Sequence, residues 1–255
     1  MRATPRERWR SGGKAGALPE LSGQARTQGR FAIYFAPAAG SSLAKAGARW
    51  LGRDAQARMA LAQPQVEELS SARLAAITAA PRHYGFHATL KAPFLPAEDT
   101  TAPELHEASA RLAAGRRAFS LSLCVGEISG FLALVPVRTP GALVDLEAAC
   151  VQQLDRFRAP ARQMEVEKRR AAGLTARQEA LLREWGYPYV LDEFRFHMTL
   201  TERLEEPERG QVKRSLQKMF GPILDLPVRI DSISLFEQPD RRSPFAEIAR
   251  YPLAG

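Results

Sequence analysis

Two short segments with the same sequence, His-x-Thr-Leu, constrain the fold of this chain more than any other feature. The first lies within residues 84–90 and the second within residues 194–200, so that His87 and His197 are 110 residues apart. Both segments are rich in aromatic residues and each contains a β-branched threonine, which predicts a strand for each. The chain must therefore fold so that two similar strands are supported in similar surroundings.

The segments that follow the two histidines are predicted to have the same order of elements. Each histidine strand is followed by a helix and then by two strands, and the first helix begins at the capping box of residues 101–104. The predicted strands are 119–128 and 131–137 after His87, and 227–236 and 245–251 after a helix at 207–220. A repeat of this kind predicts two related α+β lobes.

The other predicted elements complete a single bilobal domain over residues 30–255. They are a strand at 30–36 and helices at 42–51, 66–79, 141–157, 161–171 and 175–185. The apolar residues of the strand at 227–236 change parity near Asp231 and Ser232, which predicts a β-bulge. We expect lobe one over residues 30–137, a helical connection over 141–186 and lobe two over 187–255.

The net charge of +8 is unevenly distributed. Residues 1–29 contain six Lys or Arg and two Asp or Glu, so half of the excess lies in this segment. It is rich in Gly, Arg and Ser and lacks hydrophobic periodicity, which predicts a disordered N-terminal extension without a secretory signal. The rest of the chain is only mildly basic, which favours a small anionic substrate, such as a phosphate ester, over a nucleic acid.

The composition also excludes broad classes of protein. No apolar run approaches the roughly 18 residues of a membrane span, so no membrane partner is expected. Cys124 and Cys150 form no Cys-x-x-Cys pair, which argues against a disulfide framework or a thiolate zinc site. Both are expected to be buried in a protein of the reducing cytoplasm. We expect a monomer.

Strand geometry places the polar residues of each motif on one face. Alternate side chains of a strand point the same way, and here the opposite face of each segment is apolar. The polar faces consist of Gly85, His87, Thr89 and Lys91 in the first segment, and of Arg195, His197 and Thr199 in the second. The sequence thus predicts that the polar faces of the two strands carry similar groups and face one cleft.

This set of groups suits hydrolysis of a phosphodiester, particularly a cyclic one. One histidine can deprotonate the attacking water while the other protonates the departing oxygen, because the unperturbed pKa of histidine is about 6.5. Thr89 and Thr199 can donate hydrogen bonds to the phosphate oxygens, and Lys91 and Arg195 can neutralise charge that develops there. The chemistry requires no metal, and no cofactor is expected.

The other two histidines are assigned no role. His106 is predicted to lie on a solvated helix face beside Glu107. His83 is four residues before His87, a spacing that suits a metal site only on a helix. Pro81, Gly85 and the β-rich flank argue against a helix there, so a metal site is not predicted.

At residues 84–94 and 185–201 the sequence resembles the two-histidine phosphoesterase superfamily, which includes RNA 2′,3′-cyclic phosphodiesterases once described as 2′-5′ RNA ligases. It is most similar to the branch encoded near bacterial carbon–phosphorus lyase genes and assigned to phosphonate metabolism. The resemblance covers about residues 30–251. It implies a bilobal α+β fold with pseudo-twofold symmetry, in which two antiparallel sheets form a central cleft with helices outside.

The resemblance also implies roles for particular residues. His87, Thr89, His197 and Thr199 match the catalytic positions of the family. An aromatic residue stacks on a base in the RNA-acting members, and Tyr34 or Tyr187 is a candidate for that role. The gene neighbourhood of the branch implies a ribose cyclic phosphate as the substrate class.

Two other functions are considered beside hydrolysis of a cyclic phosphodiester on a small sugar phosphate or nucleotide. One is an RNA-end 2′,3′-cyclic phosphodiesterase, against which the weak basicity of residues 30–255 argues. The other is a non-catalytic protein that binds phosphorylated metabolites. Pseudo-symmetry makes the acid and base roles of the two histidines interchangeable at this stage.

Overall fold

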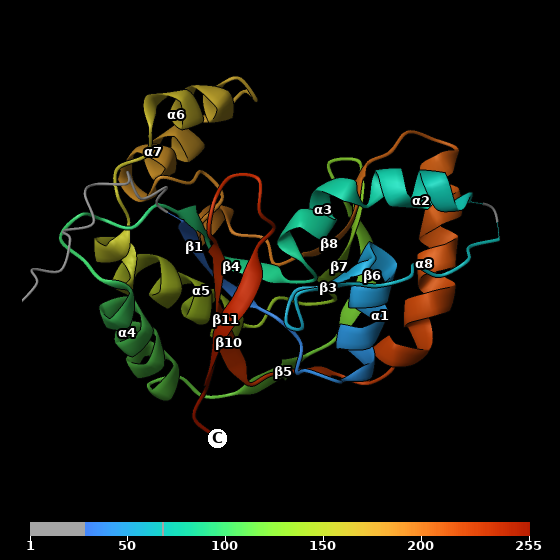
Figure 1. Ribbon diagram of the computed structural model, residues 1–255, viewed down its shortest axis with the longest axis horizontal. Helices are drawn as coiled ribbons and strands as arrows, with labels where there is room; N and C mark the ends of the chain where they lie inside the picture. The colour runs from blue at the N-terminus through green and yellow to red at the C-terminus, as the bar shows by residue number, and fades with distance from the viewer. Residues whose placement is uncertain (1–28, 68) are drawn as a thin grey trace, which may run out of the picture.

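Seven antiparallel strands form one sheet through the middle of the molecule (Figure 1). The computed structural model describes residues 29–67 and 69–255, so the prediction for the N-terminal segment lies, apart from Gly29, outside the described residues. The order of the strands in the sheet is β11-β10-β1-β4-β8-β7-β6. In chain order they are β1 Arg30–Phe35, β4 Ala88–Phe94, β6 Leu123–Ile128, β7 Phe131–Pro136, β8 Met198–Arg203, β10 Ser232–Gln238 and β11 Ala246–Pro252.

The sheet has two halves that meet at a single pair of residues. Ala88 of β4 pairs with Met198 of β8, which joins β11-β10-β1-β4 to β8-β7-β6. The predicted α+β class, built on antiparallel strands, is confirmed. The boundaries of the lobes differ from the prediction, because β10 and β11 extend the half that contains β1 and β4. The lobes are therefore not the contiguous segments 30–137 and 187–255.

Two smaller sheets of two strands each accompany the large one. In the first, β2 Arg53–Asp54 pairs with β3 Met59–Ala60. In the second, β5 Phe119–Leu121 pairs with β9 Val228–Ile230. The second sheet joins equivalent strands of the two predicted repeats.

Helices flank the sheet at both ends (Figure 1). In the described residues they are α1 Ser42–Leu51, α2 Ser71–Ile77, α3 Ala79–Tyr84, α4 Ala102–Ala114, α5 Gly141–Gln153, α6 Gln163–Arg170, α7 Ala176–Trp185 and α8 Glu208–Leu224, with 3-10 turns at Asp155–Phe157 and Leu191–Glu193. Helices α4 to α7 lie on one side of Figure 1, and α1, α2 and α8 on the other. In the described part of the chain, no helix combines the length and apolarity that spanning a membrane requires.

Side chains at the helix starts explain why several helices begin where the sequence predicts. The hydroxyl of Ser41 accepts a hydrogen bond from the Ala44 amide at 3.2 Å and caps α1. Thr101 begins α4 and Thr175 begins α7, and each forms a capping box with the residue three positions later. A cap of this kind contributes about 1 kcal/mol, because it satisfies amides that have no partner within the helix.

The predicted repeat is present in the order of the elements. The series β4-α4-β5-β6-β7 is followed by β8-α8-β9-β10-β11. The symmetry does not extend to the order of the sheet, because β1 lies beside β4 whereas β7 lies beside β8. The twofold relation is therefore limited to the two motif strands, β4 and β8, and to the pair formed by β5 and β9.

Three local predictions need correction. Residues 66–79 form no single helix; instead α2 and α3 follow each other, and Pro81 is accommodated in the first turn of α3, where its missing amide costs little. The parity change at Asp231 marks the break between β9 and β10, which belong to different sheets. Cys124 is exposed, because it lies on the outer face of the edge strand β6, whereas Cys150 is buried.

A row of buried side chains crosses the back of the sheet and joins its halves. Phe35, Ala88, Met198 and Leu134 are successive cross-strand partners from β1 to β7, and none is more than 1% exposed. Burial of a side chain such as phenylalanine, leucine or methionine contributes roughly 1.5–3 kcal/mol. This row fixes which way β4 and β8 face, and hence where the alternate residues of the two motifs point.

Candidate active site

The ring of His87 is fixed by two hydrogen bonds. Gly85 caps the C-terminal end of helix α3, and its carbonyl oxygen lies 2.9 Å from Nδ1 of His87. A carbonyl can only accept, so Nδ1 carries the proton and the neutral ring has its lone pair on Nε2. The hydroxyl of Thr89 lies 3.3 Å from that Nε2 and donates to it. His87 is thus held in the tautomer that a general base requires.

His197 is held in the same way. Its Nδ1 lies 2.7 Å from the carbonyl oxygen of Arg195, again two residues before the histidine. The same argument assigns the proton to Nδ1 and leaves Nε2 available for proton transfer. The ring of Phe131 packs near the imidazole, with 5.6 Å between ring centroids. In both motifs, therefore, the backbone carbonyl of the residue two positions before the histidine orients the imidazole ring.

The pairing of β4 with β8 brings the two motifs together. Because Ala88 pairs with Met198 in antiparallel register, His87 lies across from Thr199 and Thr89 lies across from His197. Side chains of directly opposed residues leave the sheet on the same face. The four predicted catalytic residues therefore form one group on the face opposite the buried row.

A cavity of about 620 Å³ opens beside this group. Thr89 of one motif and His197 of the other both line it, together with Arg195 and Arg203, whereas His87 and Thr199 are not among its lining residues. Pockets of 300–1,000 Å³ accommodate small-molecule ligands. A phosphorylated ligand in this cavity would meet a hydroxyl donor, an imidazole and two guanidinium groups.

The surroundings of both histidines lower their pKa values below the usual value for histidine. Burial, together with a smaller repulsion from His197, lowers the pKa of His87 to about 4, and the Gly85 carbonyl opposes this effect. Burial likewise lowers the pKa of His197 below the usual value, and the Arg195 carbonyl opposes this effect.

These shifts predict an acidic optimum for a reaction that needs one charged and one neutral histidine. The pH dependence of kcat/KM reports the pKa values of the free enzyme, and both lie below 6.5. We therefore expect kcat/KM to reach its maximum below pH 6.5 and to fall as pH rises and the charged form is lost. Initial rates between pH 4 and 9, with circular dichroism to establish that the protein stays folded, test this. An optimum above pH 7 would contradict it.

The two aromatic candidates have different positions. Tyr34 is fully buried and stacks on His87 with ring centroids 3.8 Å apart, so it does not meet a ligand as the sequence suggested. It instead supports the plane of the imidazole. Tyr187 lines the cavity, and the guanidinium of Arg169 lies 4.5 Å from its ring centroid. Tyr187 is thus the one of the two that is placed to contact a ligand.

Lys91 is not placed to contact a phosphate. It is 4% exposed, and its ammonium donates to the Val151 carbonyl at 2.9 Å and to Asp155 at 3.0 Å. The reason is a shift of register in β4, where Tyr34 pairs with Thr89 but Ile33 pairs with Lys91. This irregularity places Lys91 opposite Ile33, whose side chain belongs to the buried core. Arg195, in contrast, is exposed at the rim of the cavity.

The remaining histidines have structural partners. Nε2 of His83 lies 2.8 Å from the amide nitrogen of Gln238, which donates to it. Nδ1 of His106 lies 2.7 Å from the hydroxyl of Tyr251, so this side chain is packed and not merely solvated. Within residues 29–67 and 69–255, no group of three or more His, Cys, Asp or Glu side chains is arranged to hold a metal ion.

Several groups at the site were not identified from the sequence. The carbonyls of Gly85 and Arg195 each belong to the residue two positions before a histidine. Alignment of the two motifs could therefore have identified them. Arg203 and Glu147 also line the cavity, but they lie outside the motifs and carry no sequence signal of their own. Their contribution depends on how β8 and α5 pack.

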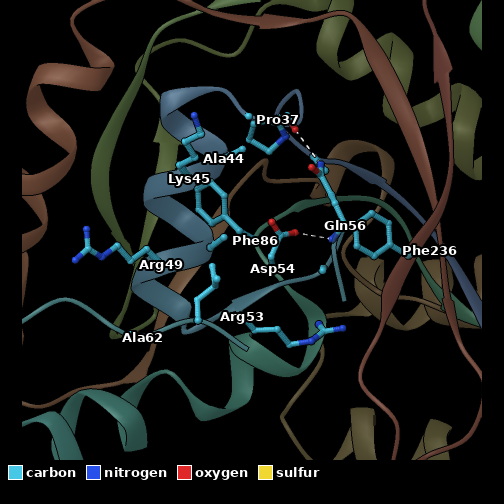
Figure 2. Close-up of a pocket in the computed structure, with 15 residues that line it drawn as sticks. Pro37, Ala44, Lys45, Arg49, Arg53, Asp54, Gln56, Ala62, Phe86 and Phe236 are labelled. Atoms are coloured by element: carbon cyan, nitrogen blue, oxygen red, sulfur yellow. Dashed lines mark hydrogen bonds between the residues drawn. The ribbon is translucent and has the colours of Figure 1, made fainter. Parts of the chain in front are cut away.

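A second cavity, of about 450 Å³, lies beside α1 (Figure 2). Phe86 and Phe236 are among its lining residues, but none of the four motif side chains is. Figure 2 shows the side chain of Arg49 extending away from it, and the Asp54 carboxylate accepting a hydrogen bond from the Gln56 amide. The cavity lined by His197 is therefore the candidate active site.

Comparison with known proteins places the chain among related sequences. Residues 89–246 match the model of a family described as "Protein of unknown function (DUF1045)". The chain is 35% identical over 250 residues to a protein of Janthinobacterium sp. (strain Marseille) named ribose 1,5-bisphosphate phosphokinase PhnN, covering 96% of this chain and 55% of that protein. A protein of the same name from Laribacter hongkongensis (strain HLHK9) is 36% identical over 216 residues, with 85% and 50% covered. The chain spans about half the length of these curated relatives.

Solved structures give more distant matches. The crystal structure of E. coli LigT complexed with NADP⁺ matches with a TM-score of 0.41 and 14% identity, over 89% of this chain and 99% of that chain. A crystal structure described as a phosphoesterase matches with the same TM-score and 15% identity, over 89% and 99%.

Proposed function

We propose that this chain, which belongs to the DUF1045 family of proteins of unknown function, hydrolyses a cyclic phosphodiester on a small sugar phosphate or nucleotide without a metal ion. The proposal includes a monomer acting in the cytoplasm and a role linked to phosphonate metabolism. One observation carries it: the Ala88–Met198 pair joins the two His-x-Thr motifs, and one residue of each, Thr89 and His197, lines the same cavity.

The proposed reaction uses one histidine on each side of the phosphorus. The neutral imidazole takes a proton from water through Nε2, and the water oxygen forms a new bond to phosphorus. The other imidazole, protonated, gives its proton to the ring oxygen as the P–O bond breaks, so the product is a monoester with a free hydroxyl. General acid–base assistance of this kind contributes roughly 10²–10⁴-fold per group.

The surrounding groups are proposed to bind and polarise the phosphate. When the phosphate binds, the Thr89 hydroxyl turns from Nε2 of His87 to a phosphate oxygen and Thr199 donates to another, each hydrogen bond contributing about 1.5–3 kcal/mol to a charged acceptor. Arg195 and Arg203, which line the cavity, offset the charge that develops on the phosphate. The bound anion also raises the pKa of the nearby imidazoles, which helps one of them to carry a proton.

The phosphokinase name of the longer relatives does not fit the residues of this chain. A kinase that binds ATP through a P-loop needs the sequence Gly-x-x-x-x-Gly-Lys-Ser/Thr, whose backbone amides hold the phosphates. The only Gly-Lys pair here is Gly13-Lys14, which is followed by Ala15. We therefore propose hydrolysis, not phosphoryl transfer from ATP, for the segment that these proteins share.

A turnover screen in the presence of a metal chelator tests the proposal. The panel contains ribose 1,2- and 2,3-cyclic phosphates, nucleoside 2′,3′-cyclic phosphates and an RNA oligonucleotide with a 2′,3′-cyclic end. We expect hydrolysis of a small cyclic phosphate that persists with chelator. Preference for the oligonucleotide would favour the RNA-end enzyme, and binding without turnover across the panel would favour the non-catalytic binder. A requirement for added metal would reject the mechanism.

A further inference from the structure

A buried carboxyl group lines the candidate active site without a role in the proposed proton transfers. Glu147, on α5, is 1% exposed, and it is one of the residues that line the 620 Å³ cavity. Burial of a carboxyl is costly unless it is paired or hydrogen-bonded. The burial of the Glu147 carboxyl beside a ligand-sized cavity therefore needs a compensating interaction.

The contacts of Glu147 within the described residues leave much of its hydrogen-bonding capacity unused. The Leu191 amide donates to it, at 3.2 and 3.3 Å from the two carboxyl oxygens. An ionised carboxylate has about four acceptor positions. The nearby Lys91 ammonium is engaged with Asp155 instead. Burial raises the pKa of Glu147 to about 7, although the Leu191 amide and Lys91 both oppose this effect.

A second carboxylate lines the same cavity and comes from a neighbouring element. Glu193 lies on the 3-10 turn that begins with Leu191, and it accepts a hydrogen bond of 2.9 Å from the side-chain amide of Gln178 on α7. The cations come from other elements: Arg195 lies in the segment that leads to β8, and Arg203 lies at the end of β8. The lining thus combines cations, which suit a phosphate, with acceptors, which suit hydroxyl groups.

We propose that Glu147 accepts a hydrogen bond from a free hydroxyl of the substrate and makes the site selective for polyhydroxylated phosphates. The proposal rests on the proposed function, because it assigns a specificity residue to the same cavity. A site built to bond a hydroxyl rejects an analogue that lacks it, since a buried polar group is then left unpaired. Glu147 takes no part in bond making or breaking.

A purely positional role for Glu147 predicts different behaviour. Leu191 has a φ of 55°, and the Glu147 carboxyl holds its amide at the start of the turn that carries Glu193. If this were its only role, substitution would disturb the cavity for every ligand alike. Selectivity between a hydroxylated ligand and its hydroxyl-free analogue separates the two roles.

The kinetic test compares Glu147→Gln with the wild type on two matched substrates. Ribose 2,3-cyclic phosphate carries free hydroxyls, and the cyclic phosphate of 1,4-anhydroerythritol has the same fused rings without them. The amide can still accept from Leu191, but it replaces a charged acceptor by a weaker neutral one. We expect KM to rise about tenfold for the ribose compound and less than twofold for the analogue. Glu98→Gln, an exposed residue outside the cavity, is the matched control and should change neither.

A binding measurement separates failure of this proposal from failure of the proposed function. Calorimetry with ribose 5-phosphate and tetrahydrofurfuryl phosphate, its hydroxyl-free counterpart, needs no turnover. Preferential binding of ribose 5-phosphate that Glu147→Gln reduces about tenfold supports the proposal, even if no cyclic phosphate is hydrolysed. Equal binding of both ligands by the wild type, or an equal loss for both in the variant, overturns it.

Discussion

Replacing His87 by glutamine is expected to lower kcat for the cyclic phosphodiester at least 100-fold, and His197→Gln is expected to do the same. Glutamine preserves much of the side chain's size and polarity, but it cannot transfer a proton near neutral pH. Each histidine contributes roughly 10²–10⁴-fold if it acts as general acid or base. Initial rates with saturating substrate and chelator measure the effect.

The double variant distinguishes a cooperating pair from two independent residues. If both histidines act in one step, the loss in His87→Gln/His197→Gln should be much smaller than the product of the single losses. His106→Gln serves as the control, since His106 lies on α4, outside both motifs, and bonds to Tyr251. Near-normal turnover in either single variant would contradict the assignment of that histidine.

Gly85→Ala is expected to destabilise the protein by about 3 kcal/mol. Gly85 has φ 82° and ψ 177°, a region that residues with a side chain adopt only under strain of roughly 1–3 kcal/mol. A Cβ at this position would also lie 2.4 Å from Cβ of Ala55, and relieving such overlap costs about 1–3 kcal/mol more. Urea denaturation at pH 7 measures the change in the free energy of unfolding.

Two further variants separate the contributions to this loss. Gly85→Ala/Ala55→Gly removes the overlapping methyl group and should recover the packing part but not the backbone part. Gly221→Ala is the control, because Gly221 lies within α8 and a Cβ there meets nothing within 4 Å. It should stabilise the protein by about 0.5–1 kcal/mol, as expected for Gly→Ala in a helix. An unchanged midpoint for Gly85→Ala would show that the conformation of residue 85 is not strained by a side chain.

Features set by local chemistry could be predicted from the sequence. The capping boxes at Thr101 and Thr175 begin helices where predicted, because each depends on residues only three positions apart. The repeated order of elements after His87 and His197 is also present. The polar face of each motif follows from strand alternation near the histidine, which holds for His87 and Thr89.

Features set by the pairing of distant strands could not be predicted. Alternation alone puts Lys91 on the face of Thr89, but the register shift against β1 places it opposite Ile33 in the core. Tyr34 has the composition of a ligand-stacking residue, yet its position beside Thr89 in the sheet buries it against His87. Glu147 joins the site only because α5 packs against β4.

The most direct test of the central claim, that the two imidazoles act on one phosphorus, is a crystal structure with vanadate and a cis-diol bound as a transition-state mimic. We predict vanadium in the cavity beside Thr89, with Nε2 of His87 and Nε2 of His197 each about 3 Å from a vanadate oxygen, on opposite sides. Vanadate bound beside α1, or in contact with only one of the two histidines, would contradict the claim.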